Sequence, residues 1–332
     1  MPNVYTGGAS ASASVTTRKY SSEGNLGWSV VHGNWVTHIA VDKEGFVYTG
    51  GFRTATDVTT RKYDSEGGLI WSRDHGNHVT SVAVDKEGFV YTGGSPSSEL
   101  TTRKYDSEGN EVWSINHGVA VEGVAVDKEG FVYTGGVRTE TDLMTTRKYD
   151  SEGNLLWSVN HGATVAGVAV DREGFVYTGG NRTLSLTTRK YNSGGGVVWS
   201  RDHGSIVYGI AVDKEGFVYT GGDRTSTDLM TTRKYDSEGD LIWSVDHESH
   251  VMAIAVDKEG YVYTGGGETV WGLSTRKYDS EGNEVWSINH GNTVRGVTVD
   301  PGLYGTGFWD VIIPVPVLTT TKQNGVVLLS WA

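Results

Sequence analysis

Apolar and polar positions along the chain follow a short-range pattern that is typical of β-strands. The stretch 165–203 reads VAGVAVD, REG, FVYTGG, NRTLS, LTTRKYN, SGGG, VVWSRDH. Four runs rich in Val, Thr, Tyr, Phe and Trp are separated by glycine-centred breaks, and no helical period of apolar residues occurs. We therefore predict four strands in this stretch, named A, B, C and D in chain order.

The same pattern recurs seven times. The string Thr-Arg-Lys-Tyr returns every 42 to 44 residues and ends at Tyr20, Tyr63, Tyr105, Tyr149, Tyr191, Tyr235 and Tyr278. A Trp-Ser pair, and a histidine four places after the Trp, keep the same spacing. Four strands in 42–44 residues is the size of one blade of a β-propeller, in which blades pack face to face around a central channel.

The breaks between the strands have the chemistry of hairpin turns. Asp-Lys-Glu-Gly at 42–45 joins strands A and B, and Asp-Ser-Glu-Gly at 64–67 joins strands C and D. An Asp side chain accepts hydrogen bonds within such a turn, and Gly adopts the positive φ that the turn requires. Of the 47 glycines, 33 fall at fixed places of the repeat, so the glycine excess indicates turns and strand ends and not disorder.

The two ends of the repeat region predict a closed ring. The chain begins inside a blade, with strand B at 3–8, C at 15–20 and D at 26–32. After the seventh histidine comes one more A strand, 293–300, without a blade of its own. We predict an all-β, seven-bladed propeller with four antiparallel strands per blade, in which this C-terminal A strand joins the N-terminal B, C and D strands and so removes an open sheet edge.

The repeated strings also resemble a known family. GVAVDREGFVYTGG followed by TTRKYDSEGNLLWS resembles the seven-bladed β-propeller repeat family of bacterial and phage surface proteins, over residues 1–300. More distantly, the chain is similar to the streptogramin-lyase and NHL propellers. The resemblance implies the fold and little about activity, because such a family is defined by its repeats and not by a site.

Residues 301–332 depart from the repeat. They contain a Pro-rich linker and then PVLTTTKQNGVVLLSWA, which resembles the first two strands of a fibronectin type III domain. We therefore expect a propeller at 1–300, and at 301–332 an extension that holds a truncated fibronectin type III start.

Composition excludes several classes of function. The net charge of −12 argues against a sequence-independent grip on nucleic acid or an anionic membrane, and no apolar stretch is long enough to span a bilayer. The start of the chain has no signal-peptide pattern. The absence of Cys excludes disulfides, zinc ribbons and thiol catalysis. We expect a monomer that binds neither nucleic acid nor membrane.

The seven histidines and seven tryptophans of the repeat suggest a structural role. One His and one Trp per blade are spread around the ring, whereas a metal site needs convergent ligands. We expect each His to bond to the backbone or a hydroxyl of a neighbouring blade, much as WD-repeat proteins use a buried His network. The acidic turns offer too few ligands for a calcium loop. No nucleophile or phosphate-loop motif occurs, so we expect no metal, no cofactor and no enzymatic activity.

The seven copies differ mainly at one end of the predicted ring. The A–B and C–D turns are nearly constant, whereas the B–C loops and the D–A connections vary. Loops on a rigid scaffold are where binding usually resides, and aromatic and Arg side chains are common anchors. We predict a binding face whose candidate residues are Trp35, His38, His78, Glu122, Tyr208, Met252, Trp271 and Arg295.

These observations favour a binding or scaffold module of a larger bacterial or phage surface protein, extracellular or virion-associated, that recognises a glycan or a protein. Two alternatives remain open. An enzyme in the channel mouth, resembling the propeller lyases, would use Glu122, His78, Tyr208 and Arg295 as acid–base residues, which requires their side chains to converge. A recently amplified or engineered repeat would have a purely structural role, and its loops would differ by drift alone.

Overall fold

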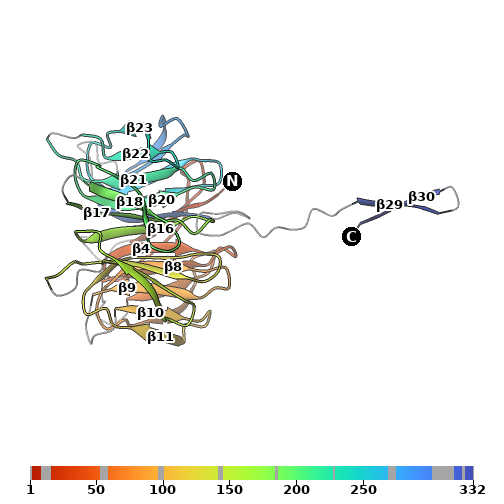
Figure 1. Cartoon of the computed structure of the whole chain (residues 1–332), viewed down its shortest axis with the longest axis horizontal. Helices are drawn as coiled ribbons and strands as arrows, with labels where there is room; N and C mark the ends of the chain where they lie inside the picture. Colours follow the sequence, from red (N-terminus) through yellow and green to blue (C-terminus); the bar gives the residue numbers. More distant parts are fainter. Residues whose placement is uncertain are drawn as a thin grey trace.

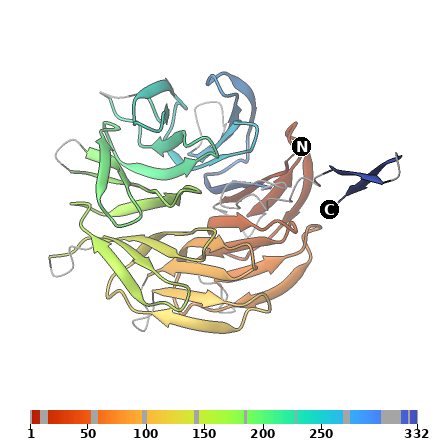
Figure 2. The same ribbon diagram turned by 45° about the vertical axis from the view of Figure 1, so that its right-hand side comes forward.

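The chain folds into seven four-stranded antiparallel sheets arranged around one axis (Figures 1 and 2). This computed structural model describes residues 2–8, 16–52, 59–95, 101–140, 145–183, 186–226, 229–267, 274–300, 318–323 and 326–331. In Figure 1, β8 to β11 follow one another from the middle of the molecule to its lower rim. Each sheet is one blade, with strand A innermost and strand D outermost, as the repeat predicts.

The strands of the first four blades are β28 (Val294–Val299), β1 (Val4–Gly8), β2 (Thr17–Tyr20) and β3 (Leu26–Val30) in blade 1; β4 (Val36–Val41), β5 (Val47–Gly51), β6 (Thr60–Tyr63) and β7 (Leu69–Arg73) in blade 2; β8 (Val79–Val84), β9 (Val90–Gly94), β10 (Thr102–Tyr105) and β11 (Glu111–Ile115) in blade 3; and β12 (Val121–Val126), β13 (Val132–Gly136), β14 (Thr146–Tyr149) and β15 (Leu155–Val159) in blade 4.

The strands of the other three blades are β16 (Val165–Val170), β17 (Val176–Thr183), β18 (Leu186–Tyr191) and β19 (Val197–Arg201) in blade 5; β20 (Val207–Val212), β21 (Val218–Gly222), β22 (Thr232–Tyr235) and β23 (Leu241–Val245) in blade 6; and β24 (Val251–Val256), β25 (Val262–Gly266), β26 (Thr275–Tyr278) and β27 (Glu284–Ile288) in blade 7. A separate hairpin consists of β29 (Leu318–Gln323) and β30 (Val326–Trp331). Whether a domain boundary lies at residue 300 stays a prediction.

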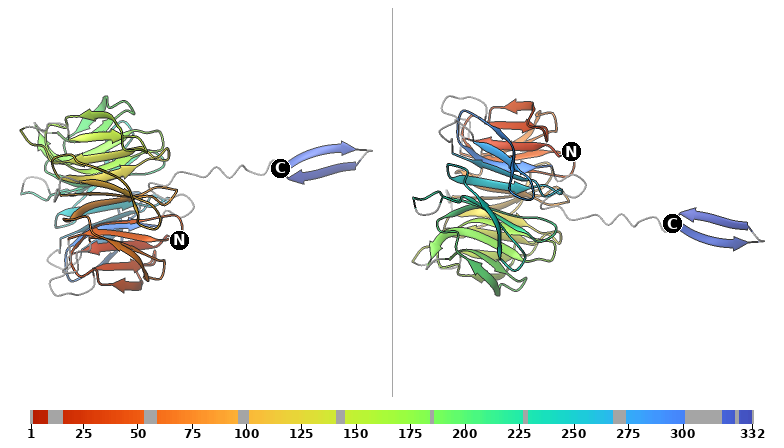
Figure 3. Two further views of the ribbon diagram at one scale, coloured as in Figure 1. Left: turned by 90° about the horizontal axis from the view of Figure 1, so that it is seen from below. Right: turned by 90° about the horizontal axis from the view of Figure 1, so that it is seen from above.

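Ring closure occurs as predicted. Strand β28 pairs antiparallel with β1, so both ends of the repeat region build blade 1, and Figure 3 shows the red N-terminal strands beside the blue ones. The Asp300 carboxylate accepts the backbone N–H of Asn3 at 3.0 Å, and the Asp300 N–H donates to the Asn3 carbonyl at 2.9 Å. These bonds reproduce across the chain ends the contacts of an unbroken A–B turn.

The A–B turn is held by a buried aspartate. Oδ1 of Asp42 accepts the backbone N–H groups of Glu44 and Phe46, and Oδ2 accepts the Tyr48 hydroxyl at 2.8 Å. Gly45 takes the positive φ of 86° that the turn requires. The other five A–B turns repeat these bonds, so the constant Asp and Gly of this turn are both structural.

Adjacent blades meet through the paired glycines at the end of strand B. A Cβ on Gly50 would lie 2.5 Å from Cγ1 of Val79 in the next blade. A Cβ on Gly51 would overlap the carbonyl oxygen of Trp35 in the same blade. The Tyr-Thr-Gly-Gly string is therefore constant because only a residue without a side chain allows both approaches.

The repeated Trp, Lys and His also bond between blades. The Trp71 Nε1–H and the Lys62 ammonium both donate to the Ser107 carbonyl in the neighbouring C–D turn. The expected histidine role is confirmed in five blades, where a ring such as that of His75 hydrogen-bonds with a Thr hydroxyl of the next blade. His117 and His290 differ, because each contacts an Arg guanidinium.

The outermost strands leave aliphatic side chains in solvent. In most blades strand D begins with two such residues, for example Leu155 and Leu156, which are 54 % and 50 % exposed. A β-bulge at this point skips one residue of strand D in the pairing with strand C. Bulges make the edge of a sheet a poorer template for pairing with another chain. Across the described residues, no helix has the length and apolar character needed to cross a membrane.

A single Gly→Ala substitution tests the close packing of neighbouring blades at the strand B glycines. Gly135→Ala places a Cβ 2.5 Å from Val165 of the next blade, and overpacking of this kind costs about 1–3 kcal/mol. We expect a lower free energy of unfolding in urea. Gly194→Ala is the matched control, because its nearest neighbour is an Asn192 side-chain oxygen at 3.5 Å. Equal stability of the two variants would contradict the packing role.

The buried histidines predict a loss of stability in mild acid. Burial lowers the pKa of His75 and His161 to about 4, and of His32, His247 and His290 to about 3. The unfolded chain binds these protons near pH 6.5, whereas the folded chain does not, so the stability present above pH 6.5 is lost as the pH falls towards 3–4.

Lowering the pH from 7.5 to 5.5 should remove about 1 kcal/mol of stability per histidine. Burial also raises the pKa of the turn aspartates, which acts in the opposite direction at lower pH. The range 7.5–5.5 lies above the ordinary titration range of carboxylates, so the histidines dominate the change. Urea unfolding followed by tryptophan fluorescence measures the effect, and a free energy of unfolding that is constant over this range would contradict it.

Candidate functional site

The channel mouth carries one residue of variable identity from each blade. In every blade a β-bulge interrupts the pairing of strands A and B at the second residue of strand A. Such bulges re-aim a side chain that the ladder leaves unpaired. We call these seven positions the bulge ring; its members line the channel and are Arg295, Thr37, Thr80, Glu122, Ala166, Tyr208 and Met252, from blades 1 to 7.

Two further variable positions lie beside the bulge ring. In blade 2 the residue after strand B, Phe52, donates its backbone N–H to the carbonyl of Trp35, the residue before strand A. The same bond links Ser95 to His78 in blade 3 and Asp223 to Ile206 in blade 6. The backbone therefore brings the start of each B–C loop against the end of the preceding D–A connection. Both sets of variable residues share one end of the ring, as predicted.

A continuous row of side chains crosses blades 1 to 3 at this end. The Arg295 guanidinium lies over the Trp35 ring at 4.7 Å from its centroid. Trp35 packs edge-on against Phe52 at 5.4 Å, and Phe52 stacks on His78 at 4.9 Å with an angle of 13° between the rings. Trp35 remains 36 % exposed. We call these four residues the aromatic row.

Hydrogen bonds fix the last member of the aromatic row. Nδ1 of His78 bonds to the Asn77 side-chain oxygen at 3.1 Å, so it carries the proton, and Nε2 accepts the Ser95 hydroxyl at 2.7 Å. Burial lowers the pKa of His78 below the ordinary histidine value. The ring is thus held neutral and in one orientation against Phe52.

The electrostatics of the bulge ring are uneven. Arg295 in blade 1 and Glu122 in blade 4 are its charged members, and burial lowers the pKa of the first and raises that of the second. Burial, and then the charge of Asp223, raise the pKa of Tyr208. No hydrogen bond or ion pair connects Arg295 or Glu122 to another residue within the described ranges.

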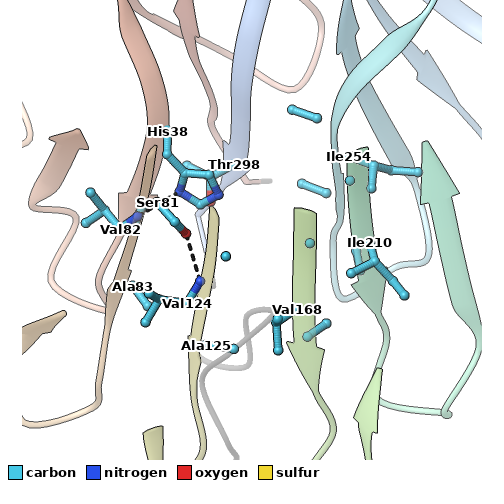
Figure 4. A pocket seen from close by; sticks show the side chains of 18 of the residues that line it. His38, Ser81, Val82, Ala83, Val124, Ala125, Val168, Ile210, Ile254 and Thr298 are labelled. Carbon is cyan, nitrogen blue, oxygen red and sulfur yellow. Dashed lines mark hydrogen bonds between the residues drawn. The ribbon is translucent and has the colours of Figure 1, made fainter. Parts of the chain in front are cut away.

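Below the bulge ring most of the side chains that line the channel are apolar. Its cavity of about 290 Å³ is lined by all seven A strands. His38 and Ser81 accept the backbone N–H groups of Val82 and Val124 in the next blade, at 3.2 and 3.0 Å. Figure 4 shows both side chains on one wall of the channel, with Val168, Ile210 and Ile254 on the other.

The structure brings together most of the predicted site residues. Glu122, Tyr208, Met252 and Arg295 are members of the bulge ring, and Trp35 and His78 belong to the aromatic row. His38 lies deeper and caps a backbone N–H, which is a structural contact. Trp271 lies outside the described residues. The binding role of the set stays a prediction.

The enzyme alternative requires four side chains to converge, and the described contacts do not bring them together. Within the described residues no contact joins any two of Glu122, His78, Tyr208 and Arg295 directly; His78 and Arg295 are linked only through Phe52 and Trp35. In the same part of the chain, no three His, Asp or Glu side chains gather in a way that would hold a metal ion.

Phe52 was missed by the sequence reasoning. In the sequence Phe52 opens a polar B–C loop, FRTATD at 52–57, and its contacts with Trp35 and His78 cannot be read from the sequence. A signal exists nonetheless. The residue after Tyr-Thr-Gly-Gly differs in all seven copies and is aromatic only at Phe52. Comparing equivalent positions across blades, and not whole loops, would have found it.

Comparisons with known proteins establish the fold and no more. No family model matches the sequence, and no curated protein matches it. The structure resembles a chain of the crystal structure of the mitotic checkpoint complex, with 16 % identity and a TM-score of 0.62 over 79 % of this chain and 80 % of that one. It also resembles the WD40 β-propeller domain of Doa1, with 16 % identity and a TM-score of 0.63 over 79 % and 86 %.

These likenesses confirm the propeller, a fold that is compatible with a binding or scaffold role. The expected membership of a bacterial and phage repeat family is not supported, because no family model matches. The fibronectin type III start expected after residue 300 is unsupported for the same reason.

The stacking of His78 on Phe52 predicts a measurable pKa change. Phe52→Ala removes the ring that covers His78, so water reaches the imidazole and its pKa should rise towards 6.5. A histidine-selective NMR titration measures the shift. Phe52→Tyr, which keeps the stacked ring, should leave the pKa unchanged. An unaltered His78 pKa in Phe52→Ala would contradict this role.

Proposed function

We propose that the protein is a non-enzymatic binding module whose ligand contacts the bulge ring and the aromatic row at the variable end of the propeller. The observation that carries the proposal is the contrast between the two ends. At one end, Asp and Gly residues build turns that are nearly constant. At the other end, three structurally equivalent positions per blade vary among the copies.

Drift alone accounts poorly for the aromatic row. Drift in solvent-exposed loops favours small polar residues, and much of the B–C loop sequence has that character. Trp35 and Phe52 are large apolar residues that pack on each other and stay partly exposed beside Arg295. Aromatic and Arg side chains at a concave mouth are the groups that most often anchor ligands.

A carbohydrate fits this arrangement best. An exposed indole binds the C–H face of a sugar, and the polar members of the bulge ring supply hydrogen-bond partners for hydroxyl groups. We further propose that the propeller is a monomer and part of a larger extracellular or virion-associated surface protein. The repeat strings and the continuation of the chain beyond the ring motivate this context.

The combined substitution of Trp35, Phe52 and Tyr208 to Ala tests the proposed face. Binding of the intact protein to a glycan array should fall at least about tenfold, because the aromatic anchors are lost. Lys43→Ala with Lys128→Ala is the control, since these exposed side chains lie in A–B turns at the opposite end. Unchanged binding by the triple variant, or equal loss in the control, would refute the proposal.

A further inference from the structure

Among the described residues, Arg295 has no counter-charge. Within that part of the chain its buried Nε atom has no hydrogen-bond partner, and no carboxylate lies within ion-pair distance of the guanidinium. Desolvation already lowers the pKa of Arg295. A partly buried cation without an anion is unfavourable, and an anion that supplies hydrogen bonds removes that cost. The channel mouth is therefore built to accept one negative group.

The surroundings of Arg295 restrict what that group can be attached to. The guanidinium lies over Trp35, whose indole is over one third exposed. Phe52 supports the indole edge-on and is itself braced by His78. An anion bound to Arg295 is thus held next to a rigid, partly exposed aromatic surface, which favours a ligand with an apolar face close to its charge.

The far side of the bulge ring has the opposite charge. Glu122 in blade 4 has no cationic partner among the described residues, and Tyr208 offers a hydroxyl two blades further on. A second negative group would be repelled by Glu122, whereas neutral hydroxyls would be accepted there. The protein carries a net charge of −12, so long-range attraction does not hold an anion at this mouth. The contact with Arg295 has to provide the binding.

We propose that the channel mouth binds a uronic-acid unit of an acidic polysaccharide, with the carboxylate on Arg295, the sugar ring against Trp35 and hydroxyl groups facing Tyr208. This inference rests on the proposed binding function and names its ligand class. Arg295 and Tyr208 both line the channel cavity, whose volume of about 290 Å³ is large enough for one sugar unit.

An acidic peptide is the competing ligand, and the structure favours it less. Protein interfaces need an apolar core. Among the described residues, most of the large exposed apolar side chains lie on the outer D strands, such as Leu69, Leu155 and Leu241, and the channel mouth offers mainly Trp35. A sugar uses one aromatic surface and many hydrogen bonds, which is what the mouth provides.

The test uses the full chain and two matched probes: oligogalacturonate and its fully methyl-esterified form, which has the same sugar rings without the charge. Oligoglucuronate, with its methyl ester, and an Asp/Glu decapeptide complete the panel. Calorimetry should give binding of at least one uronate, at least about tenfold weaker binding of its ester, and weakening in 0.5 M salt. Arg295→Gln should lose the preference for the acid, and Arg172→Gln, at an exposed arginine of an A–B turn at the opposite end, should keep it. Thermal melting of both variants confirms that they fold.

Each outcome supports or overturns the uronate assignment. Equal binding of acid and ester, or an unchanged preference in folded Arg295→Gln, overturns the uronate assignment and leaves the proposed binding function intact. Binding of the decapeptide alone replaces the sugar with a peptide ligand. No binding to either uronate overturns the assignment, and if the glycan array is also blank for the wild-type protein, the proposed function fails with it.

Discussion

The close approach of neighbouring blades at the end of strand B is the constraint on which this structure depends. Gly50 admits the Val79 side chain of the next blade, and Gly51 admits the Trp35 carbonyl of its own blade. The β-bulge of strand A lies directly opposite these two glycines, because Val36 pairs with Gly51 and His38 with Gly50. The extra residue between them, Thr37, is the member of the bulge ring in blade 2. The packing that closes the ring therefore also creates the variable position at the channel mouth.

This coupling separates the molecule into two kinds of position. The Asp of each A–B turn, the paired glycines and the bonded Trp and Lys repeat because neighbouring blades need them. In the bulge ring, only Thr37 and Thr80 bond to a described residue of a neighbouring blade: their hydroxyls donate to backbone carbonyls of the next blade. The other five side chains of the bulge ring make no such bond to a described residue, so their identity can change without loss of the fold. Arg295, Glu122 and Tyr208 are among them.

The fold was predictable from the sequence because its rules are local and repeated seven times. The turn of Asp42 to Gly45 requires one acceptor side chain and one positive φ, and both are readable from four letters. Ring closure followed from the unpaired A strand at 293–300. The role of the constant Lys of strand C depends on neighbouring blades: Lys62 lies over the Phe46 ring and donates to a carbonyl of the next blade.

The site was only partly predictable, since it depends on contacts between blades. The identity of Arg295 and Trp35 as unusual residues is visible in the aligned repeats, but their contact joins residues about 260 positions apart in the chain. The bulge that gathers the seven variable side chains has no sequence signature of its own. His38 misleads in the opposite way. It differs from its six counterparts, which suggested a binding role, but its ring accepts a backbone N–H of the next blade.

Hydrogen–deuterium exchange of the propeller, with and without a saturating concentration of the best-binding oligosaccharide, tests the central claim most directly. If the variable end is the binding face, protection will be confined to the segments around Trp35, Phe52, His78 and Arg295, and the A–B turns and outer D strands will exchange as before. Protection centred on the outer D strands, such as Leu155–Val159, would contradict the account and place binding on the exposed aliphatic side chains of the rim.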